Sequence, residues 1–293
     1  MNKGILSGIA AYALWGFFPL YFKAIEVVPA LQILGHRIVW SLLFVMIVVT
    51  LRGELTALRR SITPRTLLVY LGAGVLLAIN WGTYVWAVNA GHVVESSLGY
   101  FINPLVSVLL GVVFLGERLR PAQWIPVGLA TAGVVYLTLS YGQVPWISLV
   151  LAFSFGLYGL VKKMAPLGPL HGLAMETGTI FIPALAYLVY EQVQGTGSFI
   201  NDGPLMTGLL AFAGIATAIP LLLFATGVRS VPLTTIGLLQ YIAPTLQFLI
   251  GVLVYGEPFG PERVVGFCII WLALIVFSAE NLLNRRKTLP AAA

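Results

Sequence analysis

Charged side chains inside long apolar stretches are the residues of this sequence best suited to chemistry. Arg37 lies in the apolar run 31–51 with His36 beside it, and Glu176 lies in the run 170–191. A charge at the bilayer centre costs about 2.5–3.5 kcal/mol on insertion scales, so such residues usually have a function. We expect Arg37 to bind a carboxylate through its planar guanidinium, and Glu176 to bind an ammonium group or a coupling proton. His36 titrates near neutral pH and is a further candidate to carry a proton.

The depths of Arg37 and Glu176 indicate that the two side chains flank one cavity. Each lies a short way into its run, but the two runs are expected to enter the membrane from opposite sides. At about 1.5 Å of rise per residue, in a hydrocarbon core about 30 Å thick, the two differ in depth by roughly 12 Å. A direct ion pair would need tilted helices and extended side chains. In the alternative interpretation, neighbouring backbone and helix ends hold each charge, and neither contacts a substrate.

Amide and aromatic side chains in the same runs form a second set of candidates. We expect them to line the cavity and to contact a substrate: Asn80, Trp81, Tyr84, Asn103, Gln240 and Tyr241. Amides in the hydrocarbon region need hydrogen-bond partners, so bridging neighbouring helices is the alternative role for these residues.

The sequence offers little for catalysis or for a bound metal. Its single cysteine, Cys268, excludes an intrachain disulfide and a thiolate zinc site. Its single aspartate, Asp202, excludes an intramembrane aspartyl protease, which needs two. It contains no HExxH, G-x-S-x-G or GxxxxGK[ST] motif, and no link between apolar runs is long enough for an ATPase domain. We therefore expect a protein that is not an enzyme and that binds no cofactor or metal.

The composition is that of an integral membrane protein. Apolar residues make up 59% of the chain and charged residues 9%, where a soluble domain carries about 25%. The mean hydropathy is +0.96. The lipid bilayer is therefore an expected partner. Nucleic acid is not, because the basic residues behind the net charge of +6 are scattered between apolar runs.

Ten apolar runs are long enough to cross a bilayer, which takes about 20 residues. They cover residues 4–25, 31–51, 66–90, 94–115, 121–140, 145–163, 170–191, 204–227, 232–255 and 261–283. With a cytoplasmic N-terminus, thirteen of the 16 Lys and Arg residues fall on the cytoplasmic side. The positive-inside rule therefore predicts a multi-pass protein of the bacterial inner (plasma) membrane with both termini in the cytoplasm.

An offset of 140 residues relates the two halves of the chain. It aligns Pro104 with Pro244 and the pair Gly116–Glu117 with Gly256–Glu257, and further matches run through all five helices of each half. The chain therefore contains a duplication. Because the two glutamates follow helix-ending glycines, we expect them to have a structural role in the turns.

We expect an all-α polytopic membrane protein of ten transmembrane helices, built as two five-helix units. These are residues 1–140 and residues 141–293, the second ending in a short basic tail. A unit with an odd number of spans, followed directly by its copy, must be inserted upside down, so the repeats are inverted. Inverted repeats around a central site are typical of secondary transporters that work by alternating access. A passive facilitator or channel for small solutes remains the alternative.

Four motifs occur in a specific order: HRIVWS at 36–41, WAVNAGHVVESSL at 86–98, GYFINPL at 99–105 and FLGERL at 114–119. Together they resemble the RarD branch of the EamA group in the drug/metabolite transporter superfamily, and the resemblance covers essentially the whole chain. It implies a central cavity walled by helices 1–4 and 6–9, with helices 5 and 10 at the periphery. It also implies efflux of small metabolites, amino acids being the best-supported class. The choice between monomer and homodimer stays open.

Overall fold

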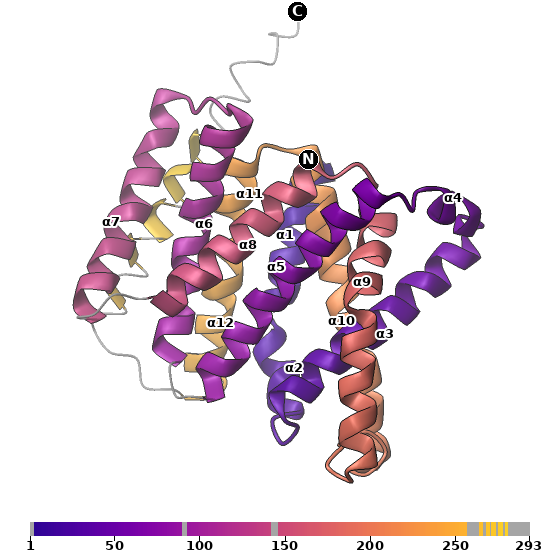
Figure 1. The fold of residues 1–293 in the computed structure, drawn as a ribbon. Coiled ribbons are helices and arrows are strands. Elements are labelled where there is room, and N and C mark those ends of the chain that lie inside the picture. Colours follow the sequence, from indigo (N-terminus) through magenta and orange to yellow (C-terminus); the bar gives the residue numbers. More distant parts are fainter. Residues whose placement is uncertain are drawn as a thin grey trace, which may run out of the picture.

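The computed structural model describes residues 3–89, 93–141 and 146–256, together with residues 264–265, 268–269, 271–273, 275–277 and 279–280. Up to residue 253 the described chain forms helices joined by short links (Figure 1). In chain order these are α1 (Lys3–Gly16), α2 (Phe18–Ala24), α3 (Ala30–Leu51), α4 (Leu55–Arg60), α5 (Pro64–Asn89), α6 (Val93–Leu115), the 3-10 helix η1 (Pro121–Gln123), α7 (Trp124–Tyr141), α8 (Trp146–Met164), α9 (Pro169–Val193), α10 (Gly203–Ser230), α11 (Leu233–Leu239) and α12 (Ile242–Leu253).

The described helices follow nine of the predicted apolar runs. α1 and α2 share the first run, and α11 and α12 share the ninth. Within the described residues, seven helical stretches are long and apolar enough to cross a membrane, and α6 adds the shorter apolar stretch Gly99–Leu115. An all-helical, multi-pass architecture is thereby confirmed. The tenth run lies largely outside the described residues, as does Glu257, so the count of ten stays a prediction.

The first run is broken where a proline removes a backbone donor. Phe17 separates α1 from α2, and Pro19 has no N–H to offer to the carbonyl of Trp15 four residues earlier. The side-chain amide of Gln247 on α12 donates to that carbonyl instead, at 3.1 Å. A side chain from the second half of the chain thus satisfies the break in the first helix.

Pro104 and Pro244, which the 140-residue offset aligns, affect their helices differently. α6 continues through Pro104, whereas α11 ends and α12 begins in a turn just before Pro244. At this turn the Tyr241 hydroxyl donates to the Phe101 carbonyl at 3.1 Å, and these two positions are themselves 140 residues apart. The two equivalent helices therefore meet at a buried contact.

The contacts between helices occur in pairs that the same 140-residue offset relates to each other. The offset carries α3 onto α9, α5 onto α10, and the first run onto α8. α1 packs against α10 while α5 packs against α8, and α3 packs against α10 while α9 packs against α5. Figure 1 places α7 at one flank of the molecule, away from α3 and α9. Each of these contacts thus has a counterpart in the other half.

A glycine-rich helix end lets the first half of the chain cap a helix in the second. Gly116 adopts a φ of +63°, a left-handed conformation that ends α6. The Glu117 carboxylate then accepts hydrogen bonds from the backbone N–H groups of Leu233, at 2.6 Å, and Thr234, at 2.9 Å, at the start of α11. A Cβ at Gly111 would lie 2.7 Å from Glu117 Oε2, so only glycine leaves room for this carboxylate. Glu117 therefore has a structural role, as expected, and it acts across the two halves.

Candidate functional site

A cavity of about 570 Å³ lies among α1, α2, α3, α5, α6, α8, α10, α12 and the turn between α11 and α12. It reaches the surface at the loop between α2 and α3, where Glu26 and Val27 are exposed. That loop lies at the opposite end of the molecule from the start of α1 (Figure 1). The volume is in the range of small-molecule sites, which hold roughly 300–1,000 Å³.

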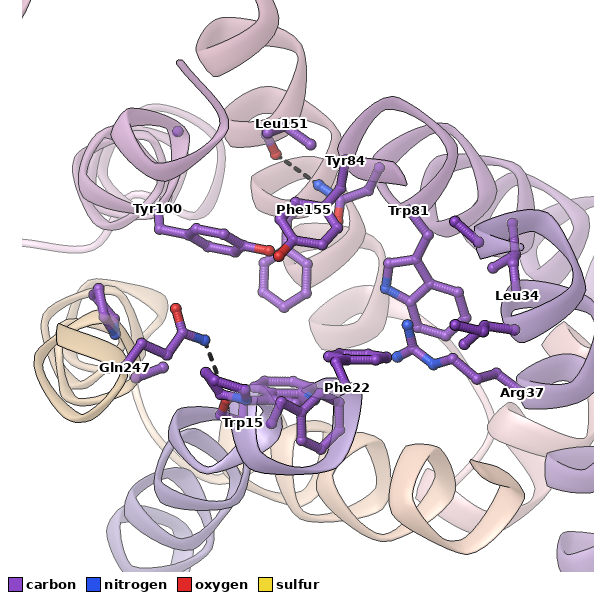
Figure 2. A pocket seen from close by; sticks show the side chains of 18 of the residues that line it. Trp15, Phe22, Leu34, Arg37, Trp81, Tyr84, Tyr100, Leu151, Phe155 and Gln247 are labelled. Atoms are coloured by element: carbon purple, nitrogen blue, oxygen red, sulfur yellow. Dashed lines mark hydrogen bonds between the residues drawn. The ribbon is translucent and has the colours of Figure 1, made fainter. Parts of the chain in front are cut away.

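Arg37 points into this cavity from α3 (Figure 2). Its Nε donates to Thr217 Oγ1 on α10 at 2.9 Å, and its guanidinium carbon lies 4.0 Å from the centroid of the Trp81 ring. The rings of Phe18 and Phe22 are 5.8 and 5.7 Å away. Among the described residues, no carboxylate forms an ion pair with Arg37. Cation–π contacts and one hydrogen bond from Nε therefore hold the guanidinium in place, and its terminal N–H groups remain available to an anion.

Aromatic rings form the walls around the open space. Tyr84 and Tyr100 project from α5 and α6 with their ring centroids 5.9 Å apart, and both are visible at the upper side of Figure 2. Trp15 and Phe155 make an edge-to-face contact at 5.7 Å on another side. Such flat apolar walls suit an aromatic or aliphatic group of a ligand.

The side-chain amides that line the cavity differ in their hydrogen bonding. Asn80 Nδ2 donates to the Leu151 carbonyl on α8 at 2.9 Å, so this amide bridges two helices as well as lining the space. By contrast, three buried oxygen atoms have no hydrogen-bond partner among the described residues: Asn103 Oδ1, Gln240 Oε1 and the hydroxyl of Tyr12. All three residues line the same cavity.

Toward the other end, aromatic packing and then a buried ion pair close the cavity. Phe155, Tyr158 and Lys162 follow one face of α8 at helical spacing. Phe155 lines the cavity, and one turn further on the Tyr158 ring stacks on Phe224 at 5.9 Å. Beyond them Lys162 Nζ lies 2.7 Å from Glu176 Oε1, while the Tyr158 hydroxyl donates to Oε2 at 3.1 Å. The two charged side chains are only 3% and 1% exposed.

Six of the nine predicted site residues line the cavity: Arg37, Asn80, Trp81, Tyr84, Asn103 and Gln240. The structure does not bring Glu176 to this lining, because Lys162 and Tyr158 hold its carboxylate deeper in the fold. His36 lines a separate cavity of about 200 Å³ between α3 and α9, where its Nδ1 accepts a hydrogen bond from Trp40 Nε1 at 3.3 Å. Tyr241 is buried and bonded to a backbone carbonyl. Substrate contact by any of these residues stays a prediction.

Several residues of the site were missed from sequence. Lys162 is one of the thirteen basic residues that the charge count assigns to the cytoplasmic side, yet it is buried and is the partner of Glu176. Phe155 and Lys162 were both detectable, because positions 151, 155, 158 and 162 share one helical face of the run 145–163. Thr217 had no such signal, since only the packing of α10 against α3 brings its hydroxyl to Arg37.

Comparison with known proteins identifies the class to which this fold and cavity belong. The EamA-like transporter family matches the chain twice, over residues 2–139 and over residues 144–279. The chain therefore belongs to the EamA-like transporter family. A solved protein crystal structure shares the fold with a TM-score of 0.73 at 20% identity, covering 94% of this chain and 97% of that chain.

Relatives that match over nearly their full length place the chain on the RarD branch of this family. Protein RarD of Streptomyces exfoliatus is 47% identical over 98% of this chain and 91% of its own. Uncharacterized transporter YojE of Bacillus subtilis is 46% identical, and Protein RarD of Escherichia coli is 41% identical, each over 98% of this chain and 97% of its own. Family and relatives together indicate a membrane transporter rather than an enzyme.

Proposed function

We propose that this protein is a secondary transporter that exports small metabolites, such as amino acids or related amphipathic compounds, by alternating access. It works in the bacterial inner membrane with both termini in the cytoplasm. The observation that carries the proposal is the guanidinium of Arg37. It faces an aromatic cavity and has no acid partner among the described residues. A cation held in this way is suited to the carboxylate of a substrate.

The geometry of the cavity supports alternating access. It reaches the surface beside Glu26, and beyond its lining residue Phe155 the buried rings of Tyr158 and Phe224 stack on each other. With a cytoplasmic N-terminus, the open end faces outside, so this is an outward-facing arrangement. The exchange of helix contacts under the 140-residue offset supports two inverted five-helix repeats, whose rocking would open the opposite end.

Transport by purified protein in proteoliposomes tests the proposal. A panel of labelled amino acids and aromatic acids is assayed with and without a proton gradient. Arg37→Lys keeps the charge but loses the planar fork, so we expect it to fold normally and to transport at least about tenfold more slowly. Arg229→Lys is the matched control, because this arginine lies outside the cavity lining and donates to the Ala165 carbonyl.

Three outcomes would contradict the proposal. Full transport by both Arg37→Lys and Arg37→Ala at normal folded yield removes Arg37 from substrate binding. Loss of folded protein in both variants supports the alternative in which Arg37 only ties α3 to α10. Flux that follows the substrate gradient alone and ignores the proton gradient would favour a passive facilitator.

A further inference from the structure

The two sides of the cavity differ in hydrogen-bonding character. Arg37, on α3, supplies donors. The unpartnered oxygens described above come from α1, α6 and the turn between α11 and α12, and we call Tyr12, Asn103 and Gln240 the acceptor pole. In Figure 2, Tyr100 of α6 and Gln247 of α12 lie across the open space from Arg37, so α6, which also carries Asn103, lies opposite the guanidinium.

The acceptor pole is a place where the protein leaves polar groups without its own partners. Tyr12, Asn103 and Gln240 are 1%, 3% and 5% exposed, so bulk water does not reach them freely. Buried polar atoms in folded proteins are nearly always hydrogen-bonded, and an unpaired one destabilises the fold. Three such atoms on three separate elements around one cavity therefore point to a ligand that supplies a donor.

The charges around the cavity are unbalanced. Among the described lining residues, Arg37 is the one cation, and Glu26 is the one carboxylate. Glu26 lies at the surface opening, where its side chain is 56% exposed and 2.6 Å from Lys23 Nζ. The deep part of the cavity therefore presents a positive charge and neutral acceptors, with no described acid to neutralise a ligand ammonium group.

A ligand that matches this arrangement has three parts. A carboxylate pairs with Arg37, an aromatic or aliphatic body lies against the rings, and an uncharged O–H or N–H donates to the acceptor pole. An α-ammonium group next to the carboxylate would lie within a few ångströms of the guanidinium and would repel it. We propose that the cavity prefers amphipathic monoanions with a neutral donor at the far end, such as hydroxyaryl carboxylates, over zwitterionic amino acids. This inference rests on the proposed function: of the two substrate groups named there, it favours the related amphipathic compounds over the amino acids.

Four small molecules separate the parts of this proposal. 3-(4-Hydroxyphenyl)propanoate carries the carboxylate and the donor, and 3-phenylpropanoate lacks the donor. Tyrosine adds the ammonium group, and tyramine lacks the carboxylate. Calorimetric titration of the full-length protein in detergent measures their dissociation constants. We expect 3-(4-hydroxyphenyl)propanoate to bind about tenfold more tightly than 3-phenylpropanoate, the scale of one hydrogen bond to a buried acceptor. Tyrosine and tyramine should both bind more weakly still.

Variants of the acceptor pole then test which residue accepts the hydrogen bond from the ligand hydroxyl. Asn103→Leu and Gln240→Leu should each reduce the hydroxyl preference, the ratio of the two dissociation constants, from about tenfold toward unity. Both should fold, since each removes an unpaired buried oxygen, and Tyr12→Phe provides a milder third variant. Asn201→Leu, in a loop outside the cavity lining, is the control and should keep the full preference.

The proposal and the proposed function fail in different ways. Tighter binding of tyrosine than of 3-(4-hydroxyphenyl)propanoate, a hydroxyl preference that survives in all three variants, or no binding of any probe would each overturn the proposal. Arg37-dependent flux of amino acids in proteoliposomes would then still support the transporter. Conversely, the expected binding pattern without protein-dependent flux would refute the transporter and leave the ligand class intact.

Discussion

The cap that Glu117 places on α11 allows a stability prediction with a magnitude. Glu117→Ala removes the acceptor of two backbone hydrogen bonds, at 2.6 and 2.9 Å, from a side chain that is only 13% exposed. Loss of an N-terminal cap costs about 0.5–2 kcal/mol. The favourable placement of a carboxylate at a partly buried helix N-terminus adds up to about 2 kcal/mol. We expect Glu117→Ala to lower the free energy of unfolding by about 2–3 kcal/mol, and Glu117→Gln, which keeps one acceptor oxygen, by about half of that.

Thermal unfolding of the purified protein in detergent measures the effect. At roughly 2–4 °C per kcal/mol for a chain of this size, Glu117→Ala should lower the Tm by at least about 4 °C. Gly111→Ala should also lower it, because the new Cβ would lie 2.7 Å from Glu117 Oε2 and displace the carboxylate. In the Glu117→Ala background, Gly111→Ala should cost little more, since the carboxylate is already gone.

Glu54→Ala is the control for Glu117. This acid is 39% exposed and lies 2.8 Å from His171 Nε2, a surface pair worth at most about 1 kcal/mol. Equal Tm values for Glu117→Ala and Glu54→Ala would refute the cap as a stabilising contact between the halves. Fully additive effects of Gly111→Ala and Glu117→Ala would show that Gly111 acts for another reason.

Two further predictions concern the buried pair and the topology. Glu176→Leu leaves Lys162 buried and unpaired and should lower the free energy of unfolding by about 3–5 kcal/mol. The double variant with Lys162→Met should recover most of the folded yield and Tm. A double variant as unstable as the single one would contradict this. In a Cys268→Ala background, an Asn201→Cys protein should react with a membrane-impermeant maleimide in intact cells, whereas Arg59→Cys should react only after permeabilisation. Labelling of both in intact cells would contradict the predicted orientation.

Part of the site followed from sequence because its signals are local. Arg37 is a charge in an apolar run, and Asn80, Trp81 and Tyr84 share one stretch of helix with each other, so their depth could be predicted. All four line the cavity. The outcome for Glu176 depended on tertiary packing, since α8 and α9 both pack against α5 and α10, and this arrangement brings Lys162 to the carboxylate.

The fold shows the same division between local and long-range information. Helix bounds followed apolar runs closely, and the break after α1 coincides with Pro19, a local signal. The different outcomes at Pro104 and Pro244 were not predictable, because both have the same local sequence type. A proline ends a helix only where neighbouring packing does not hold the backbone in place.

The ion pair beneath the stacked rings has a consequence for the kinetics of the cycle. The 140-residue offset carries Lys162 onto Phe22 and Glu176 onto His36, so the equivalent positions at the opposite end hold no carboxylate and no lysine. If the halves exchange conformations as proposed, the end that holds Lys162 and Glu176 opens by separating or hydrating a salt bridge, while no ion pair has to part between Phe22 and His36 at the other end. The resting protein would then populate the state in which the end beside Glu26 is open, as it is in the structure. Opening toward the cytoplasm would be the slow step, because separating a buried ion pair costs more free energy than parting ring contacts.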